Sequence, residues 1–119
     1  MIQRQIYQDI QDDLFQGKSI LIFGARQVGK TTLVKQLIQP YEQDTLMFNG
    51  DEPDTRELFT DITSTQLKRL IGNKRILVLD EAQRIQNIGL TLKLITDQIS
   101  DVQVIATGSS SFDLANKTS

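Results

Sequence analysis

The fold of this chain is decided by one stretch of its sequence, Gly24-Ala25-Arg26-Gln27-Val28-Gly29-Lys30-Thr31. The stretch matches the pattern GxxxxGK[ST], in which glycines allow backbone N–H groups to turn inward around an anion. An apolar run precedes it at 19–23, and a run with helical spacing of apolar residues follows it at 32–38. Because the pattern forms a phosphate-binding loop only between a strand and a helix, these flanks favour that interpretation over a chance match.

The residues of the loop have separate expected roles. Lys30 would reach the β- and γ-phosphates of a nucleotide, and the Thr31 hydroxyl would ligate Mg²⁺. The positive N-terminal end of the following helix would add to the attraction for phosphate. The predicted nucleotide-binding residues are Gly24, Ala25, Arg26, Gln27, Val28, Gly29, Lys30, Thr31 and Thr32, the last of which also suits the first turn of the helix.

A pair of acidic residues, Asp80 and Glu81, follows the apolar run 76–79. A buried parallel strand delivers such residues to the edge of the sheet where the phosphate loop also lies. We expect Asp80 to hold Mg²⁺ through water and Glu81 to orient or deprotonate the attacking water. The alternative is that the pair caps a helix or faces solvent. A GTPase is disfavoured because Gln83, rather than glycine, stands third after Asp80, and because Asn-Lys-x-Asp is absent.

Polar residues also follow the last apolar segment, in Thr107-Gly108-Ser109-Ser110. In nucleotide hydrolases with an acidic residue at the position of Glu81, this strand lies between the two that carry the phosphate loop and the acidic pair. A polar side chain at its tip can sense the γ-phosphate or hold the water, and Thr107 and Ser109 are the candidates. An ordinary turn is the alternative.

Composition limits the other classes of function. The 119 residues suffice for one domain, and a net charge of −2 without a basic run gives no indication of nucleic-acid binding. The sequence has no Cys and no His, which excludes disulfides, a cysteine nucleophile, a Ser-His triad and a His/Cys zinc site. No apolar stretch approaches the roughly 18 residues of a membrane span, so the cytoplasm is the expected location.

The order of helical and strand patterns predicts an α/β fold with a parallel sheet between layers of helices, a three-layer arrangement. Thr63 and Gln66 match a capping box before one helix, Gly72 follows that helix, and Asn87 is a plausible cap for the next. Pro40 is expected to end the helix after the loop. The expected strands are 19–23, 45–49, 75–80 and 102–107, and the expected helices are 2–14, 32–39, 54–60, 63–71 and 88–99.

Taken together, the segments 24–33, 79–83 and 107–111 resemble one family, the prokaryotic AAA-type predicted ATPases that carry a C-terminal nuclease-like domain of unknown function. The resemblance implies a P-loop core with sheet order 5-1-4-3-2 over residues 1–119, with ATP and Mg²⁺ as ligands. It implies catalytic roles for Lys30 and Glu81, Mg²⁺ ligation by Thr31 and Asp80, and a sensor role for Ser109. Arg26 would either fold over the nucleotide or stay exposed, and the second is favoured.

Members of this family are several times longer than this chain. We therefore expect the sequence to cover the N-terminal part of the core, without the fifth strand and without the region that supplies an arginine to the reaction. Loss of the fifth strand would leave the first strand as an open apolar edge, which favours self-association or marginal stability.

Three functions are compatible with these motifs: hydrolysis of ATP, a nucleotide-controlled switch or scaffold, and phosphoryl transfer to a small molecule. Transfer is the least favoured because no arginine-rich lid is apparent between 81 and 119. Glu81 favours hydrolysis over the switch. The expected hydrolysis is slow, because a missing arginine of this kind can be worth roughly 10³–10⁵ in rate.

Overall fold

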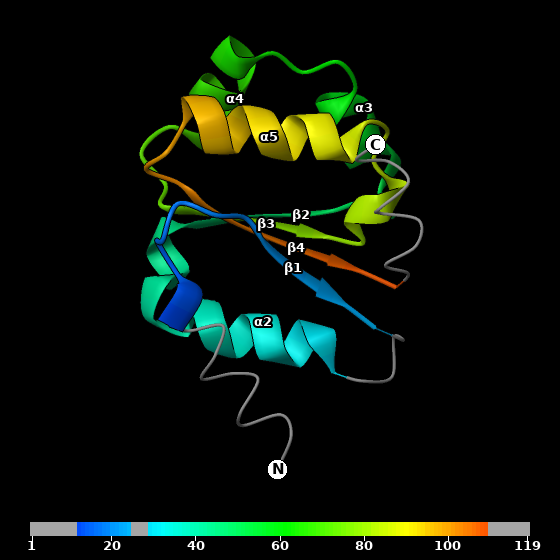
Figure 1. Ribbon diagram of the computed structural model, residues 1–119. Helices are drawn as coiled ribbons and strands as arrows, with labels where there is room; N and C mark the ends of the chain where they lie inside the picture. The colour runs from blue at the N-terminus through cyan, green and yellow to red at the C-terminus, as the bar shows by residue number, and fades with distance from the viewer. Residues whose placement is uncertain (1–11, 25–28, 110–119) are drawn as a thin grey trace.

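The structure is a computed structural model that describes residues 12–24 and 29–109. Within these ranges, four parallel strands form one sheet in the order β1-β4-β3-β2 (Figure 1). This order confirms the predicted parallel sheet and matches the expected order for these strands, and the described ranges contain no fifth strand. The strands are β1 (Ile20–Phe23), β2 (Thr45–Asn49), β3 (Ile76–Asp80) and β4 (Gln103–Gly108).

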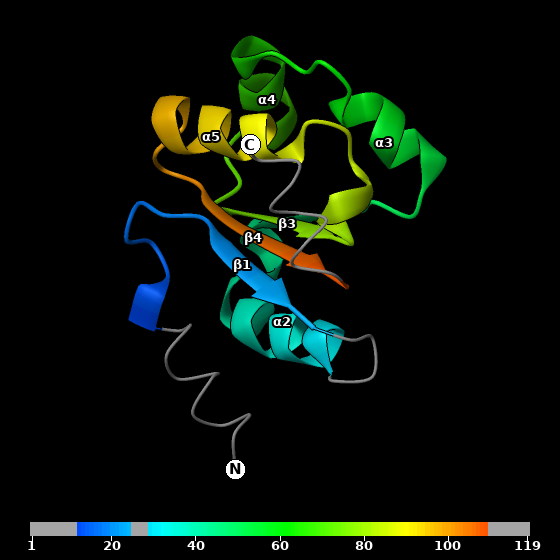
Figure 2. The same cartoon turned by 45° about the vertical axis from the view of Figure 1, so that its right-hand side comes forward.

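Helices cover both faces of the sheet, which confirms the predicted three-layer arrangement. Figures 1 and 2 show α2 (Lys30–Ile38) on one face and α4 (Ser64–Ile71) with α5 (Ile88–Gln98) on the other. A short helix, α3 (Pro53–Phe59), lies on the same side as α5. None of the helices in the described ranges is long and apolar enough to cross a membrane.

Two separate apolar cores lie on the two faces of the sheet, because successive side chains of a strand point in opposite directions. On the α2 side, Ile76 and Val78 of β3 pack with Val34 and Leu37. On the other side, Leu77 and Leu79 pack with residues of α3, α4 and α5. All four of these strand residues are fully buried, which is why β3 reads as a continuous apolar run.

The capping box before α4 is confirmed. The Thr63 hydroxyl accepts a hydrogen bond from the Gln66 N–H at 3.1 Å, and the Gln66 side chain accepts one from the Thr63 N–H at 2.9 Å. Gly72 follows the helix with a φ of 59°, which a glycine adopts without strain.

Other local predictions need correction. Asn87 precedes α5 but makes no side-chain cap, because its own backbone is left-handed with a φ of 58°. As predicted, the helix α2 ends before Pro40, but a 3₁₀ helix that was not predicted, η2 (Gln39–Asp44), contains this proline. Most of the expected helix over 2–14 lies outside the described residues, although Asp12 and Asp13 are helical.

Gly50, the first residue after β2, lies against the end of β3. Its N–H donates a hydrogen bond to the Asp80 carbonyl at 2.7 Å. A Cβ atom at this position would overlap the carbonyl oxygen of Glu81. Glycine is therefore required here by a close approach of two backbones, and this contact fixes the exit of β2 against the acidic pair.

We predict that Gly50→Ala lowers the free energy of unfolding by about 2–3 kcal/mol, because the backbone atoms in the way cannot rotate aside. Urea denaturation followed by circular dichroism measures this loss. The control is Gly17→Ala, where a Cβ also meets nothing within 4 Å and only the positive φ of 80° is unfavourable, so about 1 kcal/mol is expected. Equal losses in the two variants would contradict the steric explanation.

Candidate functional site

The candidate site lies where three parallel strands end. Phe23, the last residue of β1, pairs with Gly108, the last residue of β4. Asp80 ends β3, which pairs with β4 on the other side. The loops that follow these strands therefore meet at one edge of the sheet, next to the N-terminus of α2 (Figure 1).

The two glycines of the predicted phosphate loop have positive φ angles. Gly24 has a φ of 155° and donates a backbone hydrogen bond to the Gly108 carbonyl at 3.2 Å. Gly29 has a φ of 78° and is the N-cap of α2. Both backbone conformations are ones that L side chains rarely adopt, as the motif requires. Ala25, Arg26, Gln27 and Val28 lie outside the described residues.

Lys30, the first residue of α2, is only 4% exposed. Its ammonium group donates hydrogen bonds of 3.0 Å to the carbonyl oxygens of both Gly24 and Gly108. It also lies 3.8 Å from Oε2 of Glu81. A buried charge needs such partners. Through its two hydrogen bonds this ammonium group links the residues at the ends of β1 and β4, and it lies beside a carboxylate.

Glu81 is also buried, with 7% exposure. Its Oε1 accepts hydrogen bonds from the Ser109 hydroxyl at 2.6 Å and from the Gln83 amide at 2.9 Å. Its backbone is left-handed, with φ 49° and ψ 46°, which costs a residue other than glycine about 1 kcal/mol or more. Strained residues of this kind are concentrated at functional sites.

Asp80 is held by its neighbours through Oδ1. This oxygen accepts hydrogen bonds from the Thr107 hydroxyl and from the Glu81 N–H, the latter at 3.1 Å. The Glu81 N–H also lies 3.2 Å from the Thr107 hydroxyl oxygen. Both polar residues at the tip of β4 therefore contact the acidic pair. The Thr107 hydroxyl donates to the carboxylate of Asp80, and the Ser109 hydroxyl donates to that of Glu81.

The two threonines of the predicted loop, Thr31 and Thr32, lie in the first turn of α2 with exposed side chains. The structure thus brings Gly24, Lys30, Asp80, Glu81 and Ser109 together by direct contacts and places Thr31 in the helical turn beside Lys30.

The contact of Gln83 with Glu81 was not predicted from the sequence. The only sign of this contact in the sequence is that Gln83 stands two residues after Glu81. Its position there had argued only against a GTPase. The Gly108 carbonyl was also not predicted as a partner of Lys30, because every residue has a backbone carbonyl and the sequence does not mark which one accepts a hydrogen bond.

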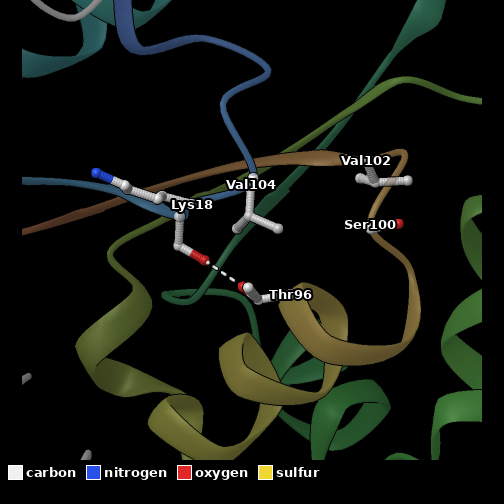
Figure 3. A pocket seen from close by; sticks show the side chains of 7 residues that line it. Lys18, Thr96, Ser100, Val102 and Val104 are labelled. Carbon is white, nitrogen blue, oxygen red and sulfur yellow. Dashed lines mark hydrogen bonds between the residues drawn. The ribbon is translucent and has the colours of Figure 1, made fainter.

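A second surface feature, the pocket shown in Figure 3, lies at the opposite edge of the sheet. It is lined by residues that precede β1 and β4, by Val104 of β4 and by Thr96 of α5, whose hydroxyl lies 3.1 Å from that of Ser19. Its volume of about 10 Å³ is room for one water molecule. It is too small for a nucleotide and separate from the acidic pair.

Comparison with solved structures places this fold among known proteins of low sequence identity. A structure of a DNA replication initiation factor has a TM-score of 0.58 at 16% identity, over 96% of this chain and 41% of that chain. The Pif1 helicase from Candida albicans has a TM-score of 0.58 at 15% identity, over 89% of this chain and 31% of that chain. Drosophila ORC bound to DNA has a TM-score of 0.59 at 14% identity, over 98% of this chain and 85% of that chain.

This chain spans less than half the length of the first two of these proteins. At such identities the similarity supports the fold alone. No curated protein matches the sequence. A family model described as an AAA domain, however, matches residues 16–119, which is most of the chain. With the parallel sheet and the loop between β1 and α2, this match shows that the chain belongs to the AAA domain family and has the core of an AAA-type P-loop ATPase.

Proposed function

We propose that this chain binds ATP with Mg²⁺ at the carboxyl edge of its sheet and hydrolyses it. Membership of the AAA domain family suggests nucleotide binding. The observation that carries the proposal further is the meeting of Lys30 with Glu81, two buried and opposite charges 3.8 Å apart beside the phosphate loop. Buried charges in such a place are candidates for catalysis as well as for structure.

Phosphate binding is assigned to the residues from Gly24 to Thr32. The N-terminus of α2 attracts anions, and the glycines permit backbone N–H groups to face them. The ammonium of Lys30 is surrounded by three oxygen atoms, from Gly24, Gly108 and Glu81. An ammonium group held among oxygens can exchange a carbonyl oxygen for a phosphate oxygen, and the negative charge of the phosphate makes that hydrogen bond stronger.

The residues assigned to Mg²⁺ fit its chemistry. Thr31 offers a hydroxyl and Asp80 a carboxylate, both hard oxygen ligands, and Mg²⁺ commonly takes few protein ligands and keeps several waters. The fixed orientation of Asp80, with Oδ1 held by Thr107, suits a residue that holds a hydrated ion. Mg²⁺, when bound, would neutralise charge on the phosphates during transfer.

Hydrolysis is assigned to Glu81. Its carboxylate would accept a proton from water as the water oxygen bonds to the terminal phosphorus and the bond to the leaving diphosphate breaks. Ser109 holds Glu81 through Oε1, so its role is to position the carboxylate. Lys30 would offset negative charge on the phosphoryl oxygens.

A second function, a nucleotide-controlled switch with little turnover, is favoured by one observation. The ammonium of Lys30 is bonded to the carbonyl at the tip of β4 and lies close to Glu81. A nucleotide that draws Lys30 away would alter both contacts at once. Nucleotide binding would therefore change the surface around Ser109 without hydrolysis. A hydrolase releases phosphate at every turnover, whereas a switch of this kind releases little.

We predict that Lys30→Ala weakens ATP binding by about 100-fold, which corresponds to about 2.7 kcal/mol, because a buried charged hydrogen-bond donor is lost. Isothermal titration calorimetry with ATP and Mg²⁺ measures the affinity. The control is Lys35→Ala, which removes an exposed lysine from the same helix. Equal affinities for wild type and Lys30→Ala would show that the phosphate site is wrongly assigned.

We predict that Glu81→Gln binds ATP within about twofold of wild type but releases phosphate roughly 10²–10⁴-fold more slowly, because the amide cannot accept a proton. A steady-state phosphate assay measures the rate, and Glu57→Gln, an exposed change on α3, is the control. An unchanged rate would remove Glu81 from the mechanism. Tight binding by wild type with no release at all would favour the switch.

We also propose that β1 mediates self-association. It is an edge strand among the described residues, and its Leu21 is 41% exposed between the buried Ile20 and Ile22. Unpaired strand edges recruit further chains, and a lysine on the edge opposes this.

The expected result in sedimentation equilibrium is an apparent mass that rises with protein concentration in the wild type and falls towards that of the monomer in Leu21→Lys. The control Met47→Lys changes a residue of similar exposure, 44%, on the other edge strand. A monomeric wild type at high concentration would contradict the proposal.

A further inference from the structure

We propose that Gln83 is a positioning residue for Glu81, an inference that rests on the proposed hydrolysis of ATP. Gln83 would hold the carboxylate so that one oxygen is fixed by donors and the other lies beside the Lys30 ammonium. Three features of the described residues support this role for Gln83: the donors on Glu81, the backbone turn between the two residues, and the unsatisfied oxygen of Gln83.

The first feature is the division of partners between the two carboxylate oxygens. Both the Gln83 amide, at 2.9 Å, and the Ser109 hydroxyl, at 2.6 Å, donate to Oε1. The other oxygen, Oε2, lies 3.8 Å from the Lys30 ammonium. Two donors on one oxygen restrict rotation of the carboxylate, which leaves Oε2 directed to the group assigned to the phosphates.

The second feature is the turn that brings Gln83 back over Glu81. The left-handed backbone of Glu81 ends β3 abruptly and starts the 3₁₀ helix η3 (Ala82–Arg84). The turn is closed by a hydrogen bond of 3.1 Å from the Arg84 N–H to the Glu81 carbonyl. This strained conformation gives residue 83, rather than a more distant one, access to the carboxylate of residue 81.

The third feature is the amide oxygen of Gln83. This atom is buried and has no hydrogen-bond partner among the described residues. Rotating the amide by half a turn would place this oxygen against Oε1 of Glu81, where two acceptors would repel each other. The amide orientation is therefore set by Glu81, and it leaves a buried acceptor unsatisfied, which is unfavourable for stability.

Gly108 makes room for this arrangement. A Cβ atom at Gly108 would lie 2.8 Å from the unsatisfied oxygen of Gln83. The same glycine accepts a hydrogen bond from Lys30 through its carbonyl oxygen. The amide of Gln83 thus lies between the tip of β4 and Glu81, where it has little room to turn away from the carboxylate.

The test compares wild type with Gln83→Met, which keeps the length of the side chain and removes its donor and acceptor. The control is Gln86→Met, an exposed glutamine just after η3. Affinity for ATP with Mg²⁺, kcat and KM for phosphate release, and the thermal unfolding midpoint are measured for each protein. Gln83→Ala is measured in parallel, so that poor packing of methionine does not decide the result.

For both Gln83 variants we expect a kcat lower by roughly 10- to 100-fold, with ATP affinity within about twofold of wild type. The unfolding midpoint of Gln83→Met should equal or exceed that of wild type, because an unsatisfied buried acceptor is removed. Gln86→Met should match wild type in every measurement.

Two results would overturn the inference while the proposed function stands. One is a kcat unchanged in both Gln83 variants of an active protein. The other is a joint loss of kcat, affinity and unfolding midpoint in both, which would make Gln83 a purely structural residue. A wild type that releases no phosphate would overturn the proposed hydrolysis and this inference with it.

Discussion

The buried ammonium group of Lys30 is the interaction on which the site depends. It connects the carbonyl that follows β1, the carbonyl at the end of β4 and a carboxylate that follows β3. These groups are far apart in sequence and meet only because the strands are parallel and adjacent. Removing a charge from water is costly, and loss of a partner from a buried pair costs about 3–5 kcal/mol, so this cluster needs all of its members.

The acidic pair is arranged by a second constraint, the left-handed backbone of Glu81. This conformation is held from outside the residue, by the Thr107 hydroxyl near its N–H and by the close contact with Gly50. Neighbouring strands thus maintain a turn that an isolated peptide would rarely adopt. The same turn directs the two carboxylates differently, with Asp80 held by Thr107 and Glu81 held by Ser109.

Much of the fold followed from local patterns. Each predicted strand was observed to within one residue of its ends, because each contains a short run of apolar residues. The capping box at Thr63 was predictable because its donors and acceptors lie within one turn of the chain. The left-handed backbone of Glu81 before η3 was not predicted, because glutamate rarely adopts this conformation. Asparagine adopts it more often, but the expected cap at Asn87 required an extended backbone instead.

The sequence by itself determined the glycine and lysine spacing of the loop, the buried strands and the position of Asp80 and Glu81 after the third of them. These properties depend on residues that are neighbours along the chain. Only the tertiary structure decided that the ammonium of Lys30 bonds to the Gly108 carbonyl and that Gln83 and Ser109 share one oxygen of Glu81. The physical reason is that every residue carries a backbone carbonyl, so the sequence does not mark which of them will accept a hydrogen bond. The order in which the strands pair determines which distant segments lie close enough to form these bonds.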